Sequence, residues 1–232
     1  KIFSNQTSNN FAFLNNKTLV REFKRNKYES KLKFIKTKKY KSIKNKIKND
    51  YLSLEVNAEN MGYVYALSKI LKIKEKFFIK SLKSFKGLAH RHEILYKKNN
   101  KIFINDSKAT SFEASRFALK NNRNIFWIVG GLPKVRDKFQ LGKIRKNIIK
   151  SYIIGNHMKS FKRYLVGKVD FQLCKTLNKA VISIFKDIKN IKDKNITVLL
   201  SPASASYDQF KNFEERGNIF KKLIKNYMKK DF

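Results

Sequence analysis

Ammonium and hydroxyl side chains follow three apolar runs of this chain within a few residues. They are Lys108 and Thr110 after the first run, Lys134 after the second and Ser206 after the third. Charge-assisted hydrogen bonds from such donors to carboxylate oxygens are strong, so this set favours a ligand that carries carboxylate groups. The alternative is that both lysines are solvated surface residues and that Thr110 caps a helix.

The three apolar runs have the length and composition of buried strands. They are KIFIN at 101–105, IFWIV at 125–129 and ITVLL at 196–200, and the second runs into Gly130 and Gly131. Consecutive glycines at a strand end let the backbone approach a ligand closely. Open parallel sheets bind ligands at the carboxyl ends of their strands. The sequence therefore predicts a ligand site at one sheet edge, with an ordinary strand–loop–helix corner as the alternative at each run.

Strands and helices alternate along the second part of the chain. We expect strands at 93–97, 101–105, 125–129, 150–154, 168–171 and 196–200. We expect helices at 111–120, 139–148, 156–164, 173–189 and 208–229. This alternation implies an α/β fold with a doubly wound, mainly parallel sheet and right-handed crossovers.

The first part of the chain has a different pattern. It predicts short strands at 11–14 and 32–35, separated by lysine-rich turns, and then two helices at 57–73 and 75–84. Along the first of these helices, residues at helical spacing are expected to form a buried stripe: Met61, Val64, Tyr65, Leu67, Ser68 and Leu71.

Three segments, in this order along the chain, resemble motifs of the Mur ligase family: NDSKAT at 105–110, GGLPK at 130–134 and SPASASYDQFKNFEERG at 201–217. Upstream, GLAHRHE at 87–93 is similar to the family's G-L-P-H-R-x-E, with Ala89 in place of the usual proline. The resemblance covers the chain from about residue 50 onward, and it is specific in the last part, which contains these segments.

Residues 52–60 resemble the family's L-x-G-x-H-N-x-x-N element. The chain keeps Asn57 and Asn60, but it has Leu54 and Val56 where glycine and histidine are usual. The resemblance implies that the two asparagines contact the adenine of ATP. Asn57 is equally suited to cap the helix that follows it.

The resemblance implies further ligand contacts. Asp106 would face the ribose and Arg91 the phosphates, since a guanidinium donates two parallel hydrogen bonds to phosphate. Within the family, the last segment most resembles members that add D-glutamate. The resemblance implies that four residues hold the carboxylates of D-glutamate, and that a fifth packs beside it from one turn into the following helix: Lys108, Thr110, Lys134 and Ser206, and then Phe213.

The resemblance also implies a piece of a larger enzyme. Residues 1–87 look like the C-terminal part of the family's central ATP-binding domain. Residues 88–232 look like the whole amino-acid-binding C-terminal domain, with Gly87 at the boundary. No G-x-x-x-x-G-K-[ST] phosphate loop occurs in the sequence. The implied cofactors are ATP and Mg²⁺, with the metal ligands upstream, and this chain alone is expected to be inactive.

The implied reaction is the ATP-dependent addition of D-glutamate to UDP-N-acetylmuramoyl-L-alanine through an acyl phosphate, a step of peptidoglycan precursor synthesis. The implied partners are these small molecules, and a monomer is expected. Two alternatives stay open. One is another ligase of Mur or folylpolyglutamate type, and the other is a non-catalytic basic binding module.

A net charge of +37 and a pI near 10.2 are typical of nucleic-acid-binding proteins. Only nine of the 54 basic residues are arginine, however, and Lys, Asn, Ile and Phe are all abundant. The codons of these four amino acids are rich in A and T, so genome composition is a sufficient cause of the charge. The densest lysine cluster, at 36–48, is poor in aromatic residues, unlike a platform that stacks single strands. We therefore expect no specific nucleic-acid partner.

The single cysteine, Cys174, excludes an internal disulfide and suggests a reducing compartment. We expect it to begin the apolar face of the helix at 173–189, as a buried structural thiol. No apolar run reaches the length of a transmembrane helix, and the three histidines have no metal-ligand spacing. These features predict a cytoplasmic protein without a membrane partner or a bound zinc ion.

Overall fold

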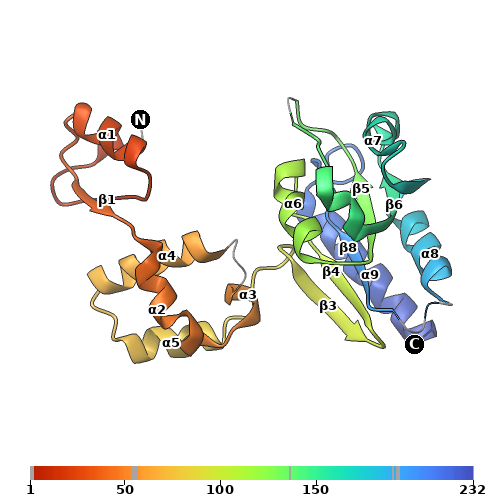
Figure 1. Ribbon diagram of the computed structural model, residues 1–232, viewed down its shortest axis with the longest axis horizontal. Helices are drawn as coiled ribbons and strands as arrows, with labels where there is room; N and C mark the ends of the chain where they lie inside the picture. The colour runs from red at the N-terminus through yellow and green to blue at the C-terminus, as the bar shows by residue number, and fades with distance from the viewer. Residues whose placement is uncertain (1–2, 54–56, 136, 190, 192–193, 232) are drawn as a thin grey trace. The chain divides into compact units, whose positions relative to one another are not determined.

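The computed structural model (Figure 1) describes most of the chain: residues 3–53, 57–135, 137–189, 191 and 194–231. Leu54 and Val56, where the sequence departs from the family's pattern, lie outside the described residues. The chain divides into two compact units, Lys1–Gly87 and Leu88–Phe232. Each unit has hydrophobic clusters of its own.

The first unit consists of short strands and helices. In chain order they are η1 (Phe3–Asn5), β1 (Phe11–Leu14), α1 (Lys17–Arg25), β2 (Lys31–Phe34), α2 (Thr37–Ile47), α3 (Asp50–Ser53), α4 (Ala58–Ile70) and α5 (Glu75–Lys83). Strands β1 and β2 pair in parallel. Buried side chains from α2 to α5 form one cluster: Tyr40, Ile43, Ile47, Leu52, Met61 and Phe78.

The expectation of lysine-rich turns in this unit is wrong, because the segments after the two strands are the helices α1 and α2. Tyr40, Ile43 and Ile47 recur every three to four residues and are buried, so the lysine-rich segment has an apolar face that a helix can bury. At the start of α1, the side chain of Asn16 accepts a hydrogen bond from the Thr18 amide (2.7 Å), which caps this helix.

The predicted buried stripe on α4 is only partly correct. Met61 and Ser68 are buried. Other members are between 45% and 61% exposed: Val64, Leu67 and Leu71. The Tyr65 ring packs against Phe78 of α5, with 5.5 Å between ring centres. The helix therefore buries the side that carries Met61 and Tyr65, and the predicted stripe wrongly included part of the neighbouring, exposed side.

In its described residues, the second unit is built around a six-stranded sheet (Figure 1). In spatial order the strands are β3 (Glu93–Lys98), β4 (Lys101–Asn105), β8 (Ile196–Leu200), β5 (Ile125–Gly130), β6 (Ile148–Ile154) and β7 (Asp170–Lys175). β3 pairs antiparallel with β4, and the other pairs are parallel. The predicted mainly parallel α/β sheet is confirmed, and the three strands that precede the predicted site residues are adjacent.

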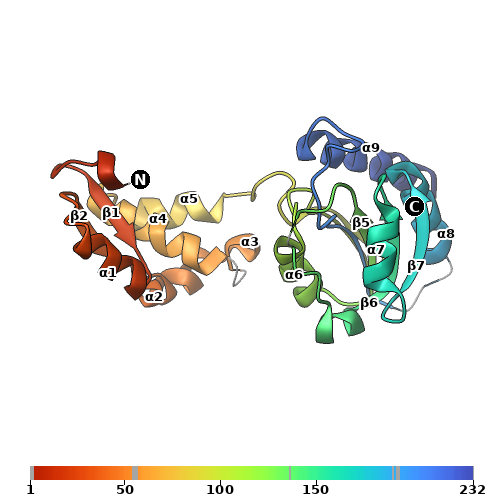
Figure 2. The ribbon, with the colours of Figure 1, turned by 90° about the horizontal axis from the view of Figure 1, so that it is seen from above.

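Helices cover both faces of this sheet. One face packs against α8 (Leu177–Ile188) and α9 (Phe213–Asp231), which lie side by side (Figure 2). The other face packs against α6 (Phe112–Asn121) and α7 (Met158–Leu165). All residues of β5 and β8 are buried, which is typical of parallel strands covered on both sides. Within the described residues, no helix combines the length and apolar character needed to cross a membrane.

The helix predicted at 139–148 is wrong over its first part. Only Gly142–Asn147 is helical, as the 3-10 helix η3. Phe139 instead packs into an aromatic cluster, with its ring centre 4.2 Å from that of Phe112 and 4.6 Å from that of Tyr164. Phe139 is thus packed against the aromatic rings of α6 and α7 and is not part of a helix.

Two other helices begin later than predicted. Cys174 lies on β7, so the expectation that it begins a helix is wrong, although it is buried. Thr176 then caps α8 through its hydroxyl, which accepts a hydrogen bond from an amide of the first turn (3.3 Å). Phe213 is the first residue of α9, not one turn into it, because the side chain of Asn212 accepts from a first-turn amide (2.8 Å).

Candidate functional site

The loops that follow β4, β8 and β5 lie together at the carboxyl edge of the sheet, and we call them the carboxyl-edge loops. The amide of Asp106 donates to the last carbonyl of β8 (2.7 Å). The Gly130 amide donates to the carbonyl of Pro202 (2.9 Å). Leu132 and Ala205 exchange two backbone hydrogen bonds of 3.0 Å. Backbone hydrogen bonds therefore join all three loops into one surface.

Lys108 and Phe213, which the sequence placed in different segments of one site, are in direct contact. The ammonium group of Lys108 lies 3.7 Å from the centre of the Phe213 ring, a cation–π contact. The Ser107 hydroxyl donates to the carbonyl of Phe213 (2.8 Å), and the Lys108 amide donates to the carbonyl of His90 (3.0 Å). The loop after β4 is thus held on both sides of Lys108.

Asp137 connects the start of α6, two residues after Thr110, to the backbone of Lys134. The carboxylate of Asp137 accepts a hydrogen bond from the Phe112 amide at the start of α6 (2.5 Å), and its own amide donates to the Lys134 carbonyl (3.2 Å). The cap of α6 is Ser111, whose hydroxyl accepts from a first-turn amide (3.3 Å). Since Ser111 and Asp137 satisfy these amides, Thr110 is not the cap of this helix.

Ser206 lies in the loop after β8 and is 2% exposed. Its carbonyl accepts hydrogen bonds from the amides of Gln209 (3.1 Å) and Phe210 (2.9 Å). The preceding residue, Ala205, pairs with Leu132 in the loop that also carries Lys134. The structure therefore places Ser206 next to the β5 loop, with little of its side chain accessible.

Asp106 and Arg91 lie near each other at the same edge. The Asp106 carboxylate accepts hydrogen bonds from the Ser201 hydroxyl (2.7 Å) and from the His92 amide (3.1 Å). Burial raises the pKa of Asp106 to about 6, while these two hydrogen bonds and the charge of Arg91 act in the opposite direction. Asp106 is therefore an ionised acceptor at neutral pH.

Asn57 and Asn60 belong to the first unit. Asn57 precedes α4, but its side chain makes no cap hydrogen bond. Its amide group donates instead to the carbonyl of Tyr51 (2.7 Å). Asn60 is exposed on the first turn of α4. The interpretation of Asn57 as a side-chain cap is therefore wrong.

Sequence reasoning missed the residues that hold the carboxyl-edge loops together: Ser107, Asp137 and Arg216. Arg216 was detectable, because it falls on the buried side of α9. Phe213, Arg216, Phe220 and Ile224 follow helical spacing, and a charged residue within such an apolar series is unusual. Ser107 and Asp137 carry no comparable signal, since the partners of their side chains, Phe213 and Arg216 for Ser107 and the Phe112 amide for Asp137, are distant in sequence.

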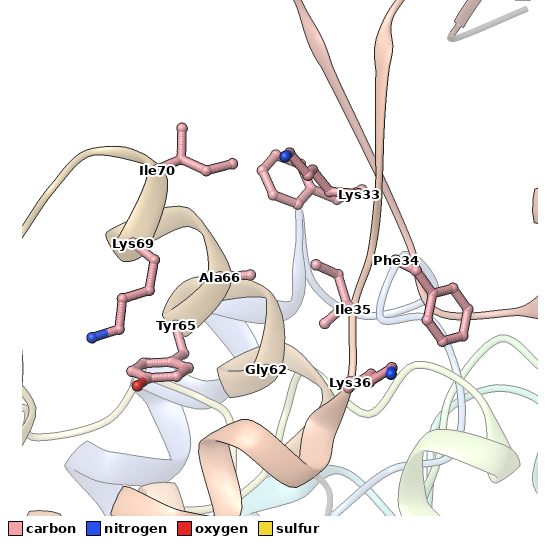
Figure 3. Close-up of a pocket in the computed structure, with 10 residues that line it drawn as sticks. Lys33, Phe34, Ile35, Lys36, Gly62, Tyr65, Ala66, Lys69 and Ile70 are labelled. Carbon is pink, nitrogen blue, oxygen red and sulfur yellow. The ribbon is translucent and has the colours of Figure 1, made fainter.

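A cavity of about 360 Å³ lies in the first unit, between the β2 strand region and α4 (Figure 3). Its lining includes Lys36, Tyr65 and Lys69, but none of the predicted site residues. In Figure 3 the ammonium groups of Lys36 and Lys69 lie on opposite sides and point away from each other. These two ammonium groups therefore do not converge on one ligand position.

Among the described residues, no group of three or more His, Cys, Asp and Glu side chains is placed to hold a metal ion. The second unit is a doubly wound α/β domain with ammonium and hydroxyl side chains at its carboxyl edge.

No protein-family model matches the chain. Curated proteins named UDP-N-acetylmuramoylalanine--D-glutamate ligase do match it. Identity is 40% over 175 residues for Wolbachia pipientis wMel, covering 75% of this chain and 34% of that ligase. It is 42% over 173 residues for Wolbachia sp. subsp. Brugia malayi, with the same two coverages, and 43% over 164 residues for Bartonella henselae, covering 71% and 35%.

The chain spans about a third of the length of these relatives. Among solved structures, the folylpolyglutamate synthase/dihydrofolate synthase of Yersinia pestis CO92 aligns with a TM-score of 0.49 at 9% identity, covering 74% of this chain and 39% of that one. MurF from Acinetobacter baumannii aligns with a TM-score of 0.47 at 17% identity, covering 75% and 37%. The curated relatives confirm the resemblance to the Mur ligases, and the chain is homologous to part of them.

Proposed function

We propose that this chain is part of an ATP-dependent amide ligase that adds D-glutamate to UDP-N-acetylmuramoyl-L-alanine during peptidoglycan precursor synthesis. The names of the curated relatives support this reaction. The observation that carries it is the contact of the Lys108 ammonium with the Phe213 ring at 3.7 Å, at an edge where Asp137 connects the start of α6 to the backbone of Lys134. A cation beside an apolar ring suits an amino acid that has both carboxylates and methylene groups.

We assign the two units to two domains of such a ligase. Lys1–Gly87 is the C-terminal part of an ATP-binding domain, and Leu88–Phe232 is the amino-acid-binding domain. The division of the chain at Gly87 supports this assignment. The ligands of Mg²⁺ belong, in this proposal, to the two thirds of the relatives that the chain does not span. We further infer a monomer in the cytoplasm, where ATP and the nucleotide-linked substrate occur.

In the proposed reaction, ATP phosphorylates the carboxylate of UDP-N-acetylmuramoyl-L-alanine, and the amine of D-glutamate attacks the acyl phosphate. Lys108, Thr110, Lys134 and Ser206 bind the two carboxylates of D-glutamate, and Phe213 packs against its methylene groups. Holding both carboxylates fixes the direction of the amine, and orientation of this kind supplies several kcal/mol of the barrier.

We propose nucleotide contacts in each unit, taken by itself. Asp106 is ionised at neutral pH and has acceptor capacity beyond its two hydrogen bonds, so it fits a ribose hydroxyl. Arg91 is exposed, with donors that suit phosphate. Asn57 and Asn60 contact the adenine in this proposal.

A hybrid enzyme tests the proposal. Residues of this chain replace the matching third of the Wolbachia pipientis wMel ligase. We expect the hybrid to release phosphate from ATP only when both UDP-N-acetylmuramoyl-L-alanine and D-glutamate are present, because the carboxyl-edge loops select the amine substrate. L-Glutamate and D-aspartate serve as controls. A folded hybrid that binds ATP but does not use D-glutamate would contradict the proposal.

We expect the 232-residue chain alone to have neither ligase nor ATPase activity. It contains no G-x-x-x-x-G-K-[ST] sequence with which to hold the phosphates of ATP. Phosphate release by the purified chain, with ATP and D-glutamate present, should equal that of a protein-free blank. Turnover above the blank would show that the chain contains a phosphate-binding element of another kind.

A further inference from the structure

Arg216, in the first turn of α9, is fully buried. Its Nε–H donates to the Ser107 hydroxyl (3.0 Å), and its Nη2 donates to the carbonyls of Ser107 (2.8 Å) and Ser204 (3.1 Å). Ser107 belongs to the loop after β4 and Ser204 to the loop after β8. One guanidinium therefore connects two of the carboxyl-edge loops.

The third carboxyl-edge loop packs against the same guanidinium. Gly131, after β5, has a φ of +134°, and a Cβ built on it would lie 3.4 Å from Nη1 of Arg216. A Cβ at Gly131 would also overlap the Ser204 hydroxyl and the carbonyl oxygen of Ala205. Within the described residues, Nη1 is buried and has no hydrogen-bond partner.

Among the described residues, no carboxylate lies within ion-pair distance of Arg216. Burial lowers its pKa to about 10, against the influence of Asp208, so the guanidinium remains positive at neutral pH. An apolar side chain of similar size would anchor α9 without the desolvation cost of a buried cation. The cation therefore has a role beyond packing.

We propose that Arg216 is a positioning residue of the carboxyl-edge site. It fixes the three loops relative to one another, and its positive charge favours an anionic group bound at their surface. The identity of that anionic group as D-glutamate rests on the proposed function. The connection between the loops rests only on the contacts of Arg216. Arg216 acts through Ser107, Ser204 and the Gly131 loop, because its own donors are buried.

Hydrogen exchange on the 232-residue chain tests the connection between the loops directly. Arg216→Lys keeps the charge but loses the planar set of donors. Ser107→Ala removes the hydroxyl that accepts from Nε and that also donates to the Phe213 carbonyl. We expect the amides of Leu132 and Ala205 to exchange about tenfold faster in Arg216→Lys, the effect of losing one hydrogen bond. The amides inside β4, β5 and β8 should keep their protection.

Arg163→Lys, at an exposed arginine of α7, is the matched control and should exchange like the unmodified chain. The proposal is overturned if Leu132 and Ala205 exchange at the original rate in both Arg216→Lys and Ser107→Ala. It is also overturned if exchange rises equally in the strands, because Arg216 would then stabilise the whole unit and not the loops.

A second measurement uses the hybrid ligase. There Arg216→Lys should raise the KM for D-glutamate about tenfold and change the KM for ATP less than about twofold, because only the loops move. An equal rise in both KM values contradicts the positioning role. If the unmodified hybrid does not use D-glutamate, the proposed function fails, while the exchange experiment still decides whether Arg216 connects the loops.

Discussion

We expect Lys134→Ala to raise the KM for D-glutamate roughly ten- to a hundredfold in the hybrid ligase, because the loss of one charged hydrogen bond costs about 1.5–3 kcal/mol. Lys134 is exposed, and its carbonyl is held by the amide of Asp137, so the substitution removes an ammonium group without removing core packing. The KM for ATP should stay within about twofold of the original. Initial rates at varied D-glutamate and ATP concentrations measure both values.

Lys138→Ala is the matched control, since Lys138 is an exposed lysine of the same connecting segment. It changes the net charge by the same amount but removes no proposed ligand, so its kinetics should match those of the parent hybrid. Equal effects of the two substitutions would mean that general electrostatic attraction, and not a contact with Lys134, favours D-glutamate.

We expect Gly130→Ala to destabilise the second unit by about 3 kcal/mol and to lower its melting temperature by about 6–12 °C. Gly130 ends β5 with a φ of +126°, a conformation that residues with a side chain rarely adopt. A Cβ there would also overlap the backbone carbonyl oxygen of Ile154 on β6. The clash is with the backbone of the neighbouring strand, so no rotamer change relieves it.

Gly142→Ala separates the effect of the positive φ from the effect of the steric clash. Gly142 also has a positive φ, +49°, but a Cβ there meets no atom within 4 Å. Its substitution should cost only about 1 kcal/mol, the strain of a left-handed residue. Thermal unfolding followed by circular dichroism measures both variants. Similar melting temperatures for the two would show that the sheet opens between β5 and β6 to admit the methyl group.

The sheet of the second unit was predictable because its central strands are fully apolar. KIFIN, IFWIV and ITVLL each became a strand at or within one residue of the predicted bounds, since a run that is buried on both faces has no competing amphipathic pattern. Their neighbouring positions followed from the alternation of strands and helices. The hydrophobic pattern therefore predicted the strands, and the alternation of strands and helices predicted which loops meet at the carboxyl edge.

Helix boundaries were less predictable, because they depend on single capping side chains. The late start of α9 depends on Asn212, and the late start of α8 depends on Thr176. The lysine-rich segment before residue 48 was misread for a different reason. Its charged residues outnumber the apolar ones, and only Tyr40, Ile43 and Ile47 mark the helical period.

For the candidate site, sequence predicted which side chains approach the carboxyl edge but not what holds them there. Lys108 and Phe213 lie 105 positions apart in the sequence, and their contact depends on how α9 returns to the sheet. Asp137 holds the start of α6 through a backbone amide, a partner that any residue supplies. Such backbone-directed hydrogen bonds leave no trace in the spacing of residue types.

The backbone hydrogen bonds between Leu132 and Ala205, and between Gly130 and Pro202, are made by the chain itself. The conformational entropy of these loops is therefore lost when the unit folds, not when a ligand binds. Fixing one residue costs roughly 1–2 kcal/mol, and each 1.4 kcal/mol is about tenfold in affinity. Ordering only two loop residues on binding would thus weaken a ligand about a hundredfold. A molecule as small as an amino acid makes few contacts with which to offset that loss, so loops that are already ordered favour the binding of D-glutamate that we propose for this edge.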